Sequence, residues 1–195
     1  MSKPRVLVLA GSTRKESVNR KLARLVADTV QAAGLDATFA DLRDYPMPIY
    51  DGDLEAEHGI PANAKALKEL ARQSDAYVIT SPEYNGSYPA VLKNAIDWIS
   101  RPEPGERHLE VFAGKLAAIL SASPGPGGGR RVLRQLRELL EMMRVTVVPQ
   151  ELAVARANEA FDSAGRLQRT EDIEGLQSLV DGLTHALERK HETAA

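Results

Sequence analysis

The sequence predicts an α/β fold built on a doubly wound parallel sheet. Short apolar runs alternate along the chain with longer segments of helical periodicity, which is typical of repeated βα units. The runs at 5–10, 75–81 and 115–123 are apolar nearly throughout, as expected of central strands covered by helices on both faces. A chain of 195 residues without a linker segment is expected to form a single domain over 1–195.

Each element follows from its own pattern. Strands are expected at 5–10, 37–42, 75–81, 115–123 and 144–150. A first helix is predicted by the apolar stripe of Val18, Leu22, Leu25, Val26 and Val30. A second begins after Pro89, which suits a first helical turn, and carries Val91, Leu92, Ala95, Ile96 and Ile99. A third carries Leu133, Leu136, Leu139, Leu140 and Met143, and a last helix is expected over 171–190. The stretches at 43–61 and 101–114 are expected to be irregular.

Composition excludes several classes of function. The formal net charge of −2 gives no basic surface for nucleic acid, and the absence of cysteine excludes disulfides, zinc–thiolate sites and a cysteine nucleophile. The four histidines are scattered, so we predict no metal site. The apolar run after the N-terminus is too short for a signal peptide, and no run suits a membrane span. We therefore expect a cytoplasmic protein without a membrane partner.

Functional residues are expected beyond the carboxyl ends of the strands. In a doubly wound sheet, ligands bind there, near the point where the strand order reverses. The loops after the first, third and fourth strands should meet at that edge, and each has an unusual sequence. A serine hydrolase is not indicated, because Ser12 is not part of a G-x-S-x-G elbow.

The first loop, GSTRKESVN at 11–19, leads into a helix whose free N–H groups suit a phosphate. Ser12, Thr13, Ser17 and Asn19 add neutral donors, and Arg14 adds a positive charge. The alternative is that Ser17 only caps the helix and Arg14 is a solvated surface cation. The loop has neither the lysine of a P-loop nor the three glycines of a dinucleotide fingerprint, so a single phosphate fits better than a diphosphate.

The second loop, SPEYNGSYPA at 81–90, is more elaborate than a turn requires. The Asn85–Gly86 pair suits positive φ, so the peptide groups from 82 to 86 could point outward in a fixed array and read the edge of a planar heteroaromatic ring. Tyr84 and Tyr88 add flat surfaces. The alternative is a turn packed by its own tyrosines.

The third loop, SASPGPGGGRR at 121–131, allows close backbone approach to a ligand, but a flexible connector explains it equally well. Together the three loops predict a monophosphate site, a hydrogen-bonding edge and a glycine wall. These features indicate a mononucleotide with a large planar ring, for which FMN is the natural candidate.

These residues form two recognisable motifs. Gly11, Ser12, Arg14, Ser17 and Asn19, with Leu22, match a phosphate motif, and Pro82 to Gly86 followed by LKNAIDW at 92–98 match a flavin-ring motif. In this order, and over roughly residues 5–150, the chain closely resembles the NADPH-dependent FMN reductase family. The third loop contains more proline and glycine than that family leads one to expect.

The resemblance implies a single flavodoxin-like, FMN-binding domain with strand order 2-1-3-4-5 in a three-layer α/β/α sandwich. It assigns the FMN phosphate to Ser12, Arg14, Ser17 and Asn19. It assigns the N5, O4 and N3 edge of the flavin ring to backbone groups of Pro82, Glu83, Tyr84, Asn85 and Gly86. It assigns the O2 side to Ser121, Ser123 and Gly125. Glu83 either makes a contact across a dimer, which we favour, or caps its own loop.

The implied activity is hydride transfer from NAD(P)H to bound FMN and on to quinones, free flavin, azo compounds or metal oxyanions such as chromate, by a ping-pong mechanism. No side chain is predicted to be catalytic, because the cofactor carries the chemistry. The family also implies a homodimer or homotetramer. The alternatives are a flavodoxin-type electron carrier or flavin-responsive interaction module, and a flavin-free NAD(P)-binding domain.

Overall fold

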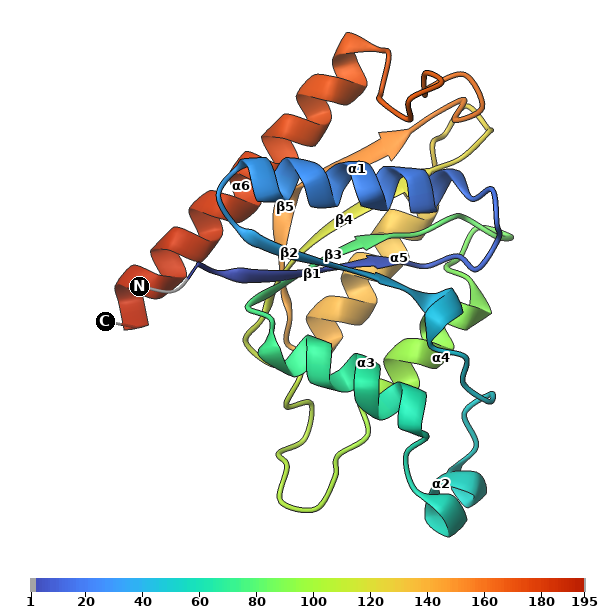
Figure 1. The fold of residues 1–195 in the computed structure, drawn as a ribbon, viewed down its shortest axis with the longest axis vertical. Coiled ribbons are helices and arrows are strands. Elements are labelled where there is room, and N and C mark those ends of the chain that lie inside the picture. The colour runs from blue at the N-terminus through green and yellow to red at the C-terminus, as the bar shows by residue number, and fades with distance from the viewer. Residues whose placement is uncertain (1–2, 195) are drawn as a thin grey trace.

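A computed structural model of the chain describes residues 3–194 and shows a three-layer α/β/α sandwich (Figure 1). The central sheet has five parallel strands in the order β2-β1-β3-β4-β5, which confirms the predicted topology. The strands are β1 (Arg5–Ala10), β2 (Asp36–Asp41), β3 (Ala76–Thr80), β4 (Leu116–Ala122) and β5 (Thr146–Val154). Because the order reverses between β1 and β3, the crevice for a ligand lies beyond the ends of these strands.

Helices cover both faces of the sheet. α1 (Val18–Ala32) and α6 (Thr170–Ala194) pack on one face, and α3 (Ala62–Gln73), α4 (Ala90–Ile99) and α5 (Arg130–Met142) pack on the other. Side chains alternate between the two cores along β1, where Val6 and Val8 face α1 while Leu7 and Leu9 face the opposite layer. This double burial explains why the central strands are apolar throughout.

Larger differences from the prediction occur in β5, in α6 and in the stretch at 43–61. β5 extends to Val154, beyond the expected 144–150, and its pairing with β4 shifts register between Ala117 and Ile119. The shift lies opposite the segment with Pro149, which has no N–H for the ladder. α6 extends to Ala194, beyond the expected 171–190. The stretch at 43–61 is not wholly irregular, because Asp51 caps a short helix, α2 (Gly52–His58).

The two long connections are tied to the helices of one layer. The indole N–H of Trp98, which is fully buried, donates to the Pro48 carbonyl at 2.8 Å, so this tryptophan belongs to the core of the chain. In the segment 101–114, Lys68 of α3 donates to the Arg101 carbonyl at 2.6 Å and also pairs with Glu106. These contacts hold the first connection to α4 and the second to α3.

Candidate functional site

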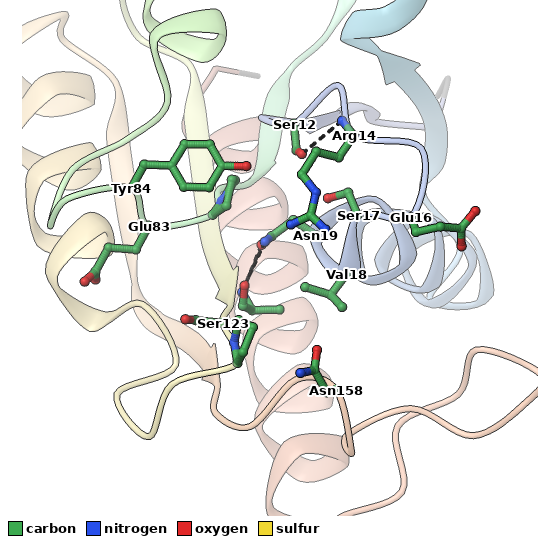
Figure 2. Close-up of a pocket in the computed structure, with 13 residues that line it drawn as sticks. Ser12, Arg14, Glu16, Ser17, Val18, Asn19, Glu83, Tyr84, Ser123 and Asn158 are labelled. Carbon is green, nitrogen blue, oxygen red and sulfur yellow. Dashed lines mark hydrogen bonds between the residues drawn. The ribbon is translucent and has the colours of Figure 1, made fainter.

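A cleft of about 280 Å³ lies at the carboxyl edge of the sheet, where the three predicted loops meet (Figure 2). Its walls come from the loop after β1 (between 12 and 19), the loop after β3 (82–84) and the end of β4 with its loop (122–124). Asn158, from the loop after β5, closes one side. The topology therefore brings the predicted segments together.

The start of α1 provides donors for an anion. Ser17 is the N-cap, and its hydroxyl accepts from the Arg20 N–H at 3.4 Å. Among the described residues, the N–H groups of Val18 and Asn19 have no hydrogen-bond acceptor. Capping and ligand binding are therefore compatible roles for Ser17, because the cap leaves two amides at the positive end of the helix dipole.

Ser12 and Arg14 complete this end of the cleft. Ser12 is 2% exposed and accepts from the Arg14 N–H at 3.4 Å. The Arg14 side chain is exposed, extends into the cleft in Figure 2 and has no acidic partner within the part of the chain that the structure describes. A guanidinium without a partner beside two free amides suits a phosphate.

Arg20 fixes the shape of this loop, a role that the sequence motif did not indicate. Its Nη1 donates to the Lys15 carbonyl at 2.7 Å, and its Nε donates to Asp41 at the end of β2 at 2.8 Å. The ion pair with Asp41 is largely buried. Arg20 therefore ties the loop after β1 to the end of the neighbouring strand β2.

The side chain of Asn19 joins α1 to β4. Its side chain is 1% exposed and bonds to both backbone groups of Ala122 at the end of β4. Its amide is thus engaged within the protein, which leaves its backbone N–H for a ligand. Asn19 lines the cleft as predicted, but its side chain acts first as a link between α1 and β4.

The loop after β3 has the predicted backbone geometry. Asn85 and Gly86 have φ angles of 52° and 79°, and Tyr84 and Ser87 close the turn with mutual backbone hydrogen bonds of 2.9 and 3.0 Å. Pro82, Glu83 and Tyr84 line the cleft, whereas Asn85 and Gly86 lie outside its lining. The turn is therefore rigid on the side that faces the cleft.

The carboxylate of Glu83 is used within the chain. Its Oε2 accepts from the backbone N–H groups of Arg131 and Val132, at 3.1 and 3.3 Å, and so caps α5. This bond joins the loop after β3 to the end of the glycine-rich loop. The favoured contact of Glu83 across a dimer stays a prediction.

The third loop reaches the cleft through Ser123 and Pro124. Ser123 lines the cleft, but Ser121 and Gly125 do not. Ser121 is fully buried beneath Gly129, and its hydroxyl has no hydrogen-bond partner among residues 3–194. A Cβ at Gly129 would lie 1.9 Å from this hydroxyl, so the glycine is required for the close approach. A ligand contact of Ser121 would have to involve its backbone.

Asn158 was missed because it belongs to no motif and lies outside the expected strand 144–150. The loop after β5 is fixed to the third loop, since the Arg156 N–H donates to Gly125 at 3.1 Å and the Ala157 N–H donates to Ser123 at 3.0 Å. The one available signal was positional, because a loop at the carboxyl end of any strand lies at this edge.

Comparison with known proteins decides the family. A family model described as NADPH-dependent FMN reductase matches residues 4–159. The chain belongs to the NADPH-dependent FMN reductase family. It is 40% identical over 147 residues to a quinone reductase of Escherichia coli (strain K12), covering 75% of this chain and 74% of that protein. It is 36% identical over 180 residues to an NAD(P)H-dependent FMN reductase of Pseudomonas aeruginosa, covering 92% of both.

Solved structures agree with this membership. The flavoenzyme NAD(P)H:(acceptor) oxidoreductase FerB from Paracoccus denitrificans superposes with a TM-score of 0.78 at 30% identity, covering 95% of this chain and 98% of that one. A flavodoxin from Pseudomonas aeruginosa, at 18% identity and a TM-score of 0.56 over 92% of this chain and 99% of its own, shares the fold. As an FMN reductase, the chain is an enzyme that uses FMN and NAD(P)H, which confirms the predicted class and cofactors.

The residues of the cleft fit FMN. The free amides of α1 and the unpaired Arg14 suit a single phosphate, and the rigid turn at 82–86 lies across the cleft from them.

None of the helices among residues 3–194 has the length and hydropathy of a membrane-spanning segment. Within the same residues, no three metal-ligating side chains of the His, Cys, Asp and Glu types come together.

Proposed function

We propose that this FMN reductase is a quinone reductase. The observation that carries the proposal is the meeting, in one cleft, of a monophosphate site at the start of α1 with a rigid positive-φ turn after β3. When bound, FMN supplies the redox chemistry, which is transfer of a hydride from NAD(P)H and of two electrons to the acceptor. The quinone reductase and NADPH:quinone oxidoreductase relatives, at 40% and 35% identity, support a quinone as the acceptor.

The phosphate of FMN is assigned to the side chains of Ser12, Arg14 and Ser17 and to the N–H groups of Val18 and Asn19. These groups combine neutral donors, one positive charge and a helix start. Arg14 would make the strongest single interaction with the phosphate, because it is the one cationic donor among the assigned groups.

The ring edge is assigned to backbone groups from Pro82 to Gly86, and the O2 side to the segment from Ser121 to Gly125. Asn158 lies beside Ser123 and adds an amide on the same side. Fixed N–H donors near O2 stabilise negative charge there without reorganising, so they favour acceptance of a hydride. No side chain of the cleft is given an acid–base role.

The kinetic mechanism and the range of acceptors follow from an FMN ring that is open on one face. Donor and acceptor would use the same exposed face of the cofactor in turn, which gives ping-pong kinetics. Free flavin, azo compounds and chromate are further acceptors of this open site. We also propose a cytoplasmic homodimer or homotetramer, which elution volume on a sizing column would test.

An anaerobic absorbance titration tests the proposal. FMN-loaded protein is mixed with NADPH or NADH, and the flavin absorbance is followed before and after a quinone is added. Bleaching within the mixing time and recovery on addition of the quinone are expected. If FMN binds but stays oxidised with both nicotinamides, the protein is an electron carrier or a sensor instead.

A further inference from the structure

One face of α5 is fastened to the turn after β3. Glu83 caps the helix, and Gln135 donates to the Gly86 carbonyl at 2.8 Å and accepts from the Ser87 hydroxyl at 2.6 Å. The helix face that carries Gln135 therefore adjoins the turn assigned to the flavin ring. The Glu83 carboxylate already accepts from the N–H groups of Arg131 and Val132 at the start of α5, so these two N–H groups do not bind a further anion.

Two exposed arginines lie on that face. Arg131 and Arg134 precede Gln135 by four residues and one residue, and the spacing places Arg131 and Gln135 one above the other. The Cδ of Arg131 is 3.9 Å from the position of a Cβ at Gly86, so its side chain lies against the turn. Across the described ranges, neither guanidinium has an acidic partner.

Arg137, on the same helix, has acidic partners, unlike Arg131 and Arg134. It pairs with Glu141 and Glu151 and donates to the Val148 carbonyl at 3.0 Å. The chain has more acidic than basic residues, 27 against 25, so acidic partners are not scarce. Within residues 3–194 no carboxylate forms an ion pair with Arg131 or Arg134, so the two guanidinium groups form a local positive site beside the turn assigned to the flavin ring.

A groove continues from these arginines along α5. It is lined by Tyr88, Arg134, Gln135, Glu138, Leu139 and Met142. Tyr88 and Met142 offer an aromatic face and a thioether, and Met142 is 73% exposed. A flat ring packs well between such groups. Glu138 can accept a hydrogen bond from an exocyclic amine.

We propose that this groove binds the adenosine 2′-phosphate end of NADPH, with Arg131 and Arg134 holding the phosphate dianion. The inference rests on the proposed use of NAD(P)H at the cleft. The adenosine 2′-phosphate end of NADPH suits the groove for two reasons. The groove begins at the turn where the nicotinamide would meet the flavin, and two unpaired guanidinium groups lie at that end of it. NADH lacks the 2′-phosphate, so the arginines select NADPH over NADH.

Steady-state kinetics with one neutral quinone provide the first test. In Arg131→Gln and Arg134→Gln, KM for NADPH is expected to rise about tenfold or more, since hydrogen bonds to charged groups contribute about 1.5–3 kcal/mol each. KM for NADH, kcat and FMN occupancy are expected to change less than twofold. Arg24→Gln is the matched control, because Arg24 is an exposed arginine of α1 that packs over Phe39 of β2. Equal changes for both nicotinamides would overturn the inference.

Calorimetry with adenosine 2′,5′-bisphosphate gives a readout without turnover. FMN-loaded wild type is expected to bind this probe at least tenfold more tightly than adenosine 5′-monophosphate, and the arginine variants are expected to lose the difference. If wild type binds both probes equally, the groove inference fails even where the reductase activity holds. If the variants instead shift the elution volume and keep the probe affinity, the groove is a contact between copies of the chain. If wild type oxidises no nicotinamide, the proposed function fails, and probe binding still reports on the groove.

Discussion

The side-chain amide of Asn19 bonds to both backbone groups of Ala122, a residue 103 positions away in the chain. Asn19 Nδ2 donates to the Ala122 carbonyl at 2.8 Å, and the Ala122 N–H donates to Oδ1 at 2.9 Å. The Thr80 hydroxyl donates to the Asn19 carbonyl at 2.9 Å. One residue therefore fixes the start of α1 relative to the ends of β3 and β4, from which the other two loops of the cleft emerge.

Asn19→Ala is expected to destabilise the fold. The substitution leaves a buried donor and a buried acceptor of Ala122 without partners, at about 1–3 kcal/mol for each group, so the free energy of unfolding should fall by about 2–6 kcal/mol. Urea unfolding of the FMN-free protein measures this change in the free energy of unfolding. Asn63→Ala is the control, because Asn63 makes an exposed bond to the Pro46 carbonyl. Equal losses in both variants would contradict a special role for Asn19.

Arg14→Ala is expected to weaken FMN binding and to leave the fold unchanged. A hydrogen bond to a charged group contributes about 1.5–3 kcal/mol, so the Kd for FMN should rise about ten- to a hundredfold, while the Kd for riboflavin should change little. Quenching of flavin fluorescence measures both. Lys15→Ala removes the same charge from the next residue, which does not line the cleft, and should have a small effect. Unchanged FMN affinity in Arg14→Ala would refute the phosphate assignment.

Ser121→Ala is expected to preserve both stability and FMN affinity. The Ser121 hydroxyl is buried against Gly129 and has no partner, so its removal deletes a desolvated polar group and no hydrogen bond. Thermal unfolding and an FMN titration should show an equal or higher Tm and a Kd within about twofold of wild type. A large loss of FMN affinity would show that this hydroxyl reorients toward the cofactor.

Ser121 also shows where prediction from the sequence ends. Strand order and the meeting of three loops were predictable, because strand burial and loop position follow from hydrophobic periodicity and βα topology. The alternation of side chains along β4 predicts which face of the sheet Ser121 lies on. It does not predict that Gly129, at the start of α5, packs against the Ser121 hydroxyl. The closure of the cleft by Asn158 depends on backbone bonds between loops that are distant in sequence, as does the engagement of the Asn19 side chain. Such pairings leave no local pattern.

A cluster of charges buried beneath the segment 101–114 should make stability depend on pH. Lys68 is 2% exposed and pairs with Glu106, which also pairs with Arg72 and accepts from the Glu103 N–H at 2.8 Å. Burial alone would raise the pKa of Glu106, but these hydrogen bonds outweigh it and lower the pKa from 4.5 to about 2. The carboxylate therefore contributes stability that is fully present above pH 4.5 and is lost as pH falls toward 2.

Glu106→Gln should remove this dependence. At pH 7 the variant leaves the Lys68 ammonium buried, and Glu103, at 3.9 Å, is its one remaining acidic neighbour among residues 3–194, so we expect the free energy of unfolding to fall by about 3 kcal/mol. The difference between wild type and variant should shrink between pH 4.5 and pH 2, because protonation removes the same charge from the wild type. Urea unfolding across this pH range measures the difference in the free energy of unfolding. Glu69→Gln is the control, because Glu69 forms an exposed ion pair with Arg72. Parallel curves for wild type and Glu106→Gln would show that the Glu106 charge does not stabilise the fold.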